Sequence, residues 1–102
     1  MKRTFTVYAD PGHAWAKVPL DVLTRIELST EDFSAYSYRF GDYIYLEEDG
    51  DLTFFAAEFH RKTGLNPQWR ERHCNGRSVI RSYNSNKPGA SYMKRRDGRY
   101  AA

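Results

Sequence analysis

The chain has 102 residues, of which 16% are aromatic and 28% are charged, and its net charge is +3. This length fits one domain with a modest core, which the large aromatic side chains can fill. The one cysteine, Cys74, excludes an internal disulfide, and no segment approaches the roughly 20 apolar residues of a membrane span. The first residues carry no apolar run of signal-peptide length, so a cytoplasmic protein without membrane attachment is expected.

The charge is divided unevenly along the chain. Residues 1–67 hold seven basic and eleven acidic residues, a net charge of −4. Residues 68–102 hold nine basic and two acidic residues, a net charge of +7. Such a division often accompanies a polyanionic partner. Solubility, or pairing with the acidic stretch at 47–51, is the alternative explanation.

The first third of the chain predicts a hairpin followed by a short helix. Residues 3–9 alternate between apolar and polar side chains, which indicates a strand. Asp, Pro and Gly at 10–12 predict a turn, and residues 14–18 form the return strand. Pro19 suits the first position of a helix over about 19–27, because its missing N–H costs nothing there. Residues 29–33 predict a capped single turn.

The middle of the chain predicts a second hairpin. Two alternating runs, 36–40 and 43–47, flank Gly41-Asp42, and a glycine in the first position is typical of a two-residue hairpin turn. In this register Phe40 faces Tyr43 and Tyr38 faces Tyr45. One face of the hairpin then carries the aromatic residues Tyr36, Tyr38, Phe40, Tyr43 and Tyr45, while the other face carries Ser37, Arg39, Ile44 and Leu46.

The remaining elements are a long helix, a third hairpin and a tail. Apolar residues at helical spacing predict a helix over 51–63, with Gly64 as its end. Asn75-Gly76 predicts a hairpin between strands at 68–73 and 78–83. Residues 84–102 have no apolar period and predict a mobile basic tail after a domain of residues 1–83. The fold class is therefore α+β: an antiparallel sheet in the order β-β-α-β-β-α-β-β with both helices on one face.

Two groups of residues are candidates for a binding surface. The tyrosines of the second hairpin offer a stacking platform for single-stranded nucleic acid, or else they pack under the helices as core. The arginines of the third hairpin resemble the footprint of a phosphate-bearing or acidic partner, or else they protect a sheet edge from strand addition. The candidate binding residues are Arg70, Arg72, Arg77, Arg81, Arg39, Tyr36, Tyr38, Tyr43, Tyr45, Lys94, Arg95 and Arg96.

Catalytic and metal-binding patterns are weak. Asp10 beside His13 has the residue types of an acid–base pair, but a turn aspartate that binds its own backbone is the alternative. His60, His73 and Cys74 lack the spacing of a zinc site, and the adjacent His73 and Cys74 point to opposite faces of a strand. The sequence contains neither of the two common glycine-rich nucleotide-binding motifs, G-x-x-x-x-G-K-[ST] and G-x-G-x-x-G. No cofactor and no metal are expected, and a non-enzymatic protein is predicted.

Four segments resemble a family of short, uncharacterised proteins of bacteriophages, prophages and plasmids. These segments are Val7-Tyr8-Ala9-Asp10-Pro11-Gly12-His13-Ala14-Trp15-Ala16-Lys17-Val18-Pro19, Tyr36-Ser37-Tyr38, Tyr45-Leu46-Glu47-Glu48-Asp49 and Ile80-Arg81-Ser82-Tyr83. The resemblance covers most of residues 4–83 and spares the tail. It brings no activity, cofactor or catalytic residue with it. It implies the context of a mobile element, whose small accessory proteins often occupy a host protein.

The leading hypothesis is therefore a non-catalytic accessory protein that binds a host protein or protein–nucleic acid complex, as an anti-CRISPR or anti-restriction inhibitor does. The second hypothesis is a small DNA- or RNA-binding module that uses the basic hairpin, the tyrosines and the tail. The third is a small enzyme centred on Asp10 and His13. The sequence does not specify an oligomeric state.

Overall fold

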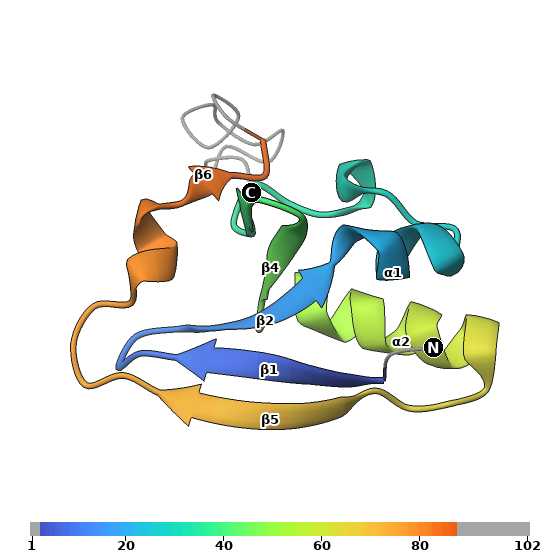
Figure 1. Ribbon diagram of the computed structural model, residues 1–102, viewed down its shortest axis with the longest axis horizontal. Coiled ribbons are helices and arrows are strands. Elements are labelled where there is room, and N and C mark those ends of the chain that lie inside the picture. The colour runs from blue at the N-terminus through green and yellow to red at the C-terminus, as the bar shows by residue number, and fades with distance from the viewer. Residues whose placement is uncertain (1–2, 88–102) are drawn as a thin grey trace.

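The computed structural model describes residues 3–87, and the elements are named in chain order. They are β1 (Thr4–Ala9), β2 (Ala14–Pro19), α1 (Leu20–Arg25), the 3-10 helix η1 (Thr30–Asp32), β3 (Tyr38–Phe40), β4 (Tyr43–Glu47), α2 (Asp51–Thr63), β5 (Gln68–His73), the 3-10 helix η2 (Val79–Ser82) and β6 (Asn84–Ser85). Over this range the strands form one sheet of six in the order β5-β1-β2-β4-β3-β6. Figure 1 shows β1 between β5 and β2. The α+β class is confirmed.

The two predicted N-terminal hairpins are present. β1 and β2 pair antiparallel, and β3 and β4 pair with Tyr38 opposite Tyr45 and Phe40 opposite Tyr43, as the alternation predicts. Gly41 has φ +60°, which a residue with a side chain adopts only at a cost. Gly64 has φ +76° and ends α2, because its N–H bonds the His60 carbonyl in a left-handed cap. Local turn chemistry therefore fixes both of these positions.

The prediction of an all-antiparallel sheet is wrong. β5 runs parallel to β1, so the sheet is mixed. After α2 the chain returns to the start of β1, where the Gln68 N–H donates to the Arg3 carbonyl over 2.8 Å. Because β5 begins beside the beginning of β1, the two strands run in the same direction. β2 already occupies the other edge of β1, so β5 takes the free edge in the same direction as β1. A helix-containing connection is what a parallel neighbour requires.

The predicted third hairpin is also wrong. Residues 79–82 form η2 rather than a return strand, and the Ser78 hydroxyl accepts from the Ile80 N–H at its start. The short strand β6 pairs instead with β3 at the far edge of the sheet. The domain predicted to end at Tyr83 therefore continues, because Asn84 and Ser85 belong to the sheet and Asn86 is buried. The remainder of the predicted tail, residues 88–102, lies outside the described residues.

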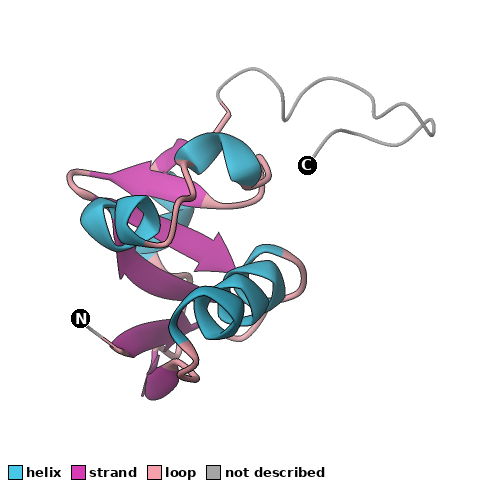
Figure 2. Cartoon of the chain, turned by 90° about the vertical axis from the view of Figure 1, so that its right-hand side faces the viewer, coloured by secondary structure: helices cyan, strands magenta, loops and turns pink. Residues whose placement is uncertain are grey.

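The main core lies between one face of the sheet and the α-helices. It contains Phe5, Val7, Ala14, Ala16, Val18, Val22, Leu23, Ile26, Phe33, Ile44, Leu46, Phe55 and Phe59. Side chains of both α1 and α2 belong to this cluster, and Figure 2 shows the helices against the strands. The opposite face of the sheet is partly covered, because Ile80 of η2 packs there on Trp15 and Tyr45 in a second cluster. The aromatic residues of that face are thus neither wholly core nor wholly exposed.

The start of α2 is held by a buried carboxylate. Asp51 accepts hydrogen bonds from the backbone and hydroxyl of Ser34 and from the hydroxyl of Ser37. Glu47 accepts bonds from the backbone N–H groups that precede and begin the helix. These bonds tie β4, α2 and the segment before β3 to one another. Among the described residues no helix is long and apolar enough to span a membrane.

Candidate functional site

The side chains of the sheet surface opposite α1 and α2 form one aromatic and basic surface, here called the tyrosine face. Strand register decides its members, because directly paired residues share a face. Its side chains come from five strands: Gln68, Arg70 and Arg72 of β5, Thr4, Thr6 and Tyr8 of β1, Trp15 and Lys17 of β2, Tyr43, Tyr45 and Glu47 of β4, and Tyr38 and Phe40 of β3. Neighbouring strands lie about 4.8 Å apart, so β5 and β3 are separated by about 19 Å.

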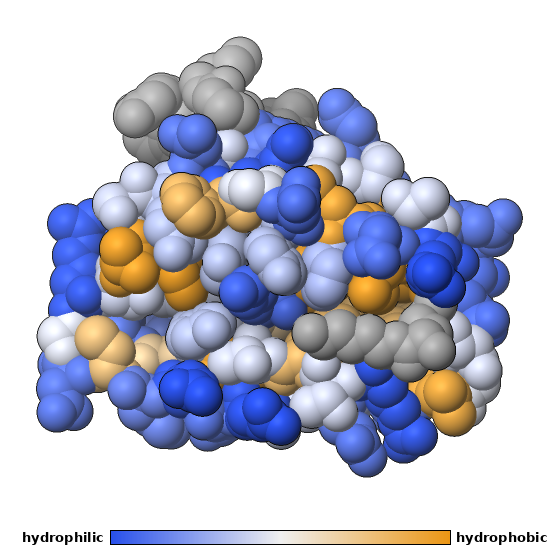
Figure 3. Space-filling model, in the orientation of Figure 1, coloured by the Kyte–Doolittle hydropathy of each residue, from blue (hydrophilic) through white to orange (hydrophobic). Residues whose placement is uncertain are grey.

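One end of the tyrosine face is basic and fully solvated. All six residues of β5 are exposed, and Arg70 and Arg72 alternate on the tyrosine face. Figure 3 shows hydrophilic residues along the edge of the molecule where β5 lies. The Lys17 ammonium lies 4.1 Å from the centre of the Tyr43 ring, a cation–π contact. Three cations thus point from the same surface as the tyrosines.

The middle of the face and its β3 end are covered by the segment 78–83, which an ion pair anchors. The Arg81 guanidinium donates to both oxygens of Asp10, from Nε over 2.7 Å and from Nη2 over 2.8 Å. The same carboxylate accepts from the backbone N–H of Gly12, His13 and Ser78, at 2.9–3.0 Å. The side chain of Asp10 is 1% exposed and that of Arg81 27%. Five bonds to one carboxylate fix the turn, η2 and the sheet together.

This arrangement determines the charge of Asp10. The Arg81 guanidinium, with the N–H groups of Ser78, His13 and Gly12, holds the pKa of the Asp10 carboxyl far below its usual range, although burial opposes the shift. The same bond raises the pKa of Arg81. His13 contributes its backbone N–H to this carboxylate. Asp10 therefore fits the alternative of a turn aspartate, whose carboxylate oxygens accept hydrogen bonds from the protein's own backbone and from Arg81.

A prediction on acid stability follows from this pKa. A carboxyl whose pKa is lower in the folded than in the unfolded protein contributes stability that is complete above the unfolded value of about 4 and is lost as the pH falls below it. We expect the urea midpoint of the protein to fall between about pH 4 and pH 2. In Asp10→Asn the midpoint should be lower at pH 7 and should change less over that range. Equal pH dependence of the two proteins would contradict this role of Asp10.

The anchored segment 78–83 packs aromatic and aliphatic side chains against the tyrosine face. Arg81 lies over the Trp15 ring at 5.3 Å, and Ile80 packs with Trp15 and Tyr45. Tyr83 stacks on Phe40 with ring centres 4.5 Å apart and an interplanar angle of 16°. Phe40 remains 58% exposed, so the stack has a ring surface open to solvent. An exposed, already stacked aromatic pair is a ready platform for a further flat ring.

Burial changes the acidity of the central tyrosine. Desolvation, together with the neighbouring hydroxyls of Tyr83 and Tyr8, raises the pKa of Tyr45 to about 12. Tyr45 is therefore neutral at physiological pH and keeps its hydroxyl proton as a donor.

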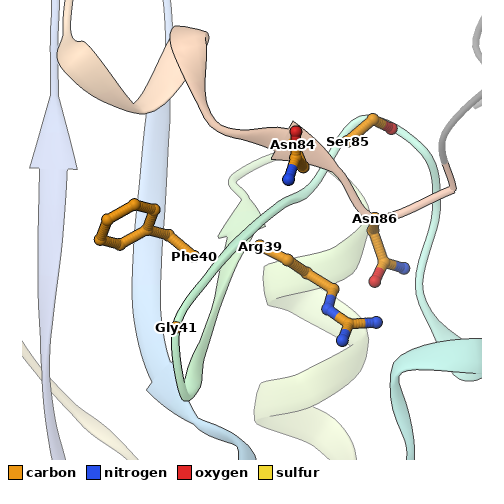
Figure 4. Close-up of a pocket in the computed structure, with 6 residues that line it drawn as sticks. All are labelled: Arg39, Phe40, Gly41, Asn84, Ser85 and Asn86. Atoms are coloured by element: carbon orange, nitrogen blue, oxygen red, sulfur yellow. The ribbon is translucent and has the colours of Figure 1, made fainter.

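A polar hollow lies at the β3–β6 edge. It measures about 380 Å³ and is lined by Arg39, Phe40, Gly41, Asn84, Ser85 and Asn86. Figure 4 shows the Phe40 ring pointing away from the Arg39 guanidinium and the Asn86 amide. Asn86 donates to the carbonyls of Thr30, Phe33 and Ser34, so its amide serves to close this edge of the domain. The hollow shares only Phe40 with the tyrosine face.

The structure brings some of the predicted binding residues together and separates others. Arg70, Arg72, Tyr38, Tyr43 and Tyr45 share the tyrosine face. Arg39 pairs with Ile44 on the helix side and Arg77 lies in an exposed loop, so these two are not part of the face. Tyr36, which precedes β3, and Arg81, which binds Asp10, line a hollow together with Trp15 and Tyr38 and so border the tyrosine face. The predicted hairpin of four arginines therefore does not exist. Lys94, Arg95 and Arg96 lie outside the described residues.

Sequence reasoning missed several members of this surface. Tyr8, Trp15 and Lys17 lie on the tyrosine face, and Tyr83 packs against it. The alternation of residues 3–9 separates Tyr8 from Phe5 and Val7, and the same alternation applied to residues 14–18 separates Trp15 and Lys17 from the core positions, so this signal was available in the sequence. Tyr83 carried no such signal, because residues 79–82 form a 3-10 helix rather than a strand.

Metal binding and known relatives add nothing to this site. Within residues 3–87 no group of three or more His, Cys, Asp or Glu side chains is placed to hold a metal ion. Comparison of the chain with family models, with curated proteins and with solved structures found no match. The function therefore has to follow from the geometry of the tyrosine face.

Proposed function

We propose that the protein is a non-catalytic binding module whose tyrosine face holds single-stranded nucleic acid. The observation that supports this most is that Arg70, Arg72 and Lys17 point from the same sheet surface as the tyrosines. Phosphates attract the cations, and bases stack on aromatic rings with about 1–3 kcal/mol each. A duplex hides its bases, so this combination favours a single strand.

The dimensions of the face agree with this proposal. Arg70 and Arg72 on β5 lie about 19 Å from the exposed stack of Phe40 and Tyr83 at β3, by the usual spacing of strands. A ligand that uses both ends must therefore be an extended chain with several charges and several rings. Single-stranded nucleic acid has both in every nucleotide.

A host protein as partner, the first hypothesis from the sequence, is less well supported by this surface. Tyr, Trp and Arg are also enriched in protein interfaces, so the difference lies in the exposed apolar side chains, which a protein interface gathers into one buried centre. The large exposed apolar side chains are Tyr36, Phe40, Phe54, Leu65, Trp69 and Val79. They come from six different segments of the chain rather than from one strand or helix.

The experiment is a binding titration of the full chain against labelled single- and double-stranded oligonucleotides of about 12 nucleotides, in DNA and RNA form. Three phosphate contacts predict that affinity for the single strand falls about eighteenfold between about 50 and 200 mM salt. Single strands should bind more tightly than duplexes of the same sequence. Absence of binding at the lower salt concentration would overturn the proposal and direct the search to a protein partner. Tighter binding to duplexes would overturn the role of the tyrosines.

A further inference from the structure

A slot opens between the tyrosine face and the segment that the Asp10–Arg81 pair anchors. Its volume is about 190 Å³, several times the roughly 30 Å³ share of one water molecule. Tyr8, Lys17 and Tyr45 line it from the sheet, and Ser78, Val79, Ile80 and Tyr83 line it from the covering segment. The slot therefore lies in the middle of the tyrosine face, between its basic end and the Phe40–Tyr83 stack.

The walls of the slot have a particular chemistry. Three tyrosines give it aromatic surface and hydroxyl groups, while Val79 and Ile80 give it an aliphatic side. The ring centres of Tyr8 and Tyr45 lie 6.5 Å apart, and those of Tyr45 and Tyr83 5.1 Å apart. A group that fits such walls is apolar in its body and carries hydrogen-bonding atoms at its edge. The Lys17 ammonium adds a positive charge to the same lining.

From this geometry we infer that the slot takes one unstacked nucleobase of the bound single strand, with its sugar–phosphate on the Lys17 side. A nucleobase has the required apolar faces and polar edge, and the adjoining phosphate has the charge that Lys17 attracts. This inference rests on the proposed function, because it assigns one base of the strand a defined place on the tyrosine face. The strand would then be held by phosphate contacts at β5, one inserted base in the slot, and stacking at Phe40.

Hydrogen bonds and burial hold the two walls of the slot in place. Ser78 and Arg81 are both bonded to Asp10, so the aliphatic wall is fixed to the turn between β1 and β2. Tyr45 is buried at the other wall. Val79, in contrast, is 65% exposed at the rim, so a larger side chain there can enter the slot without disturbing the core.

The test fills the slot and compares two strands with the same phosphates. The unsubstituted protein and Val79→Trp are titrated with oligo-dT of about 12 nucleotides and with an abasic strand of equal length. We expect Val79→Trp to weaken binding of oligo-dT about tenfold, because the loss of one inserted base removes a contact of this size. Binding of the abasic strand should not change. Leu65→Trp, an exposed leucine in the loop after α2, is the matched control and should alter neither affinity.

A second variant is needed because the tryptophan of Val79→Trp can weaken binding by displacing η2 instead of by filling the slot. Tyr8→Phe keeps the ring and removes only one hydroxyl from the wall, so it should weaken oligo-dT binding by about threefold and leave the abasic strand unaffected. If both variants bind oligo-dT as tightly as the original protein, the slot is not a base site and this inference is overturned. If the original protein binds both strands equally, the face holds phosphates alone, so the slot inference and the stacking role of the tyrosines both fail while the phosphate contacts of the proposed function remain. If it binds neither strand, the proposed function fails as well.

Discussion

Asp10→Ala should lower the Tm of the protein by on the order of 10 °C or more, because the substitution removes the acceptor of five hydrogen bonds at once. The Arg81 charge loses its partner while it remains largely covered, and the Ser78 N–H is left without an acceptor in the interior. The segment 78–83 then loses its anchor to the sheet. Thermal unfolding followed by circular dichroism measures the change.

Glu58→Ala is the matched control for Asp10→Ala. Glu58 also pairs with an arginine, Arg61, at 2.7 Å, but along the surface of α2 where the Arg61 side chain is 64% exposed. Exposed pairs of this kind contribute little to stability. We therefore expect the Tm of Glu58→Ala to stay close to that of the original protein. A similar Tm for both variants would show that the Asp10–Arg81 pair does not hold η2 in place.

The second large effect concerns binding. The double variant Arg70→Gln/Arg72→Gln should bind single-stranded oligonucleotides about fiftyfold more weakly at about 50 mM salt, and the slope of log affinity against log salt should become shallower by about 1.4. Both values follow from the loss of two phosphate contacts. Both side chains are exposed on β5, so the fold should be unaffected. Affinity measured across a salt series gives both quantities.

Arg25→Gln/Arg39→Gln is the control for this double variant. It removes the same net charge, but Arg25 lies on α1 and Arg39 points to the helix side of the sheet. If net charge alone attracted the nucleic acid, both double variants would weaken binding equally. We expect the control to retain nearly full affinity and the original salt slope. Equal losses would contradict a site located on the tyrosine face.

The parts of the fold that follow from the sequence are those set by neighbouring residues. The register of β3 and β4 follows from a two-residue turn with glycine first, and the end of α2 follows from Gly64. The parallel placement of β5 does not, because it depends on where α2 delivers the chain relative to β1. Val79 and Ile80 are good strand residues by propensity, yet they form a 3-10 helix because Ser78 and Arg81 are bonded to a carboxylate 68 and 71 positions away.

The candidate site also has a part that the sequence predicts, the tyrosines of β3 and β4, and a part that it does not, the partners of the arginines. Alternation placed Tyr38, Tyr43 and Tyr45 on one face, and strand pairing keeps them there. The arginines could not be sorted from sequence, because charge says nothing about partners. The sequence does not distinguish Arg81 from Arg70, but in the structure Arg81 pairs with Asp10 whereas Arg70 is exposed on the tyrosine face. The slot has residues from β1, β2, β4 and η2, and no local pattern joins them.

The parallel pairing of β1 with β5 also has a consequence for synthesis on the ribosome. β1 and β2 can pair as soon as both have emerged, but the other edge of β1 has to wait for residues 68–73. At about 5–20 residues per second, the roughly 60 intervening residues take between about 3 and 12 seconds to make. During that interval the nascent chain presents an unpaired strand edge, the kind of surface that recruits other strands. The arrival of β5 closes it, and the arginines that β5 brings leave the finished edge poorly suited to further strand addition.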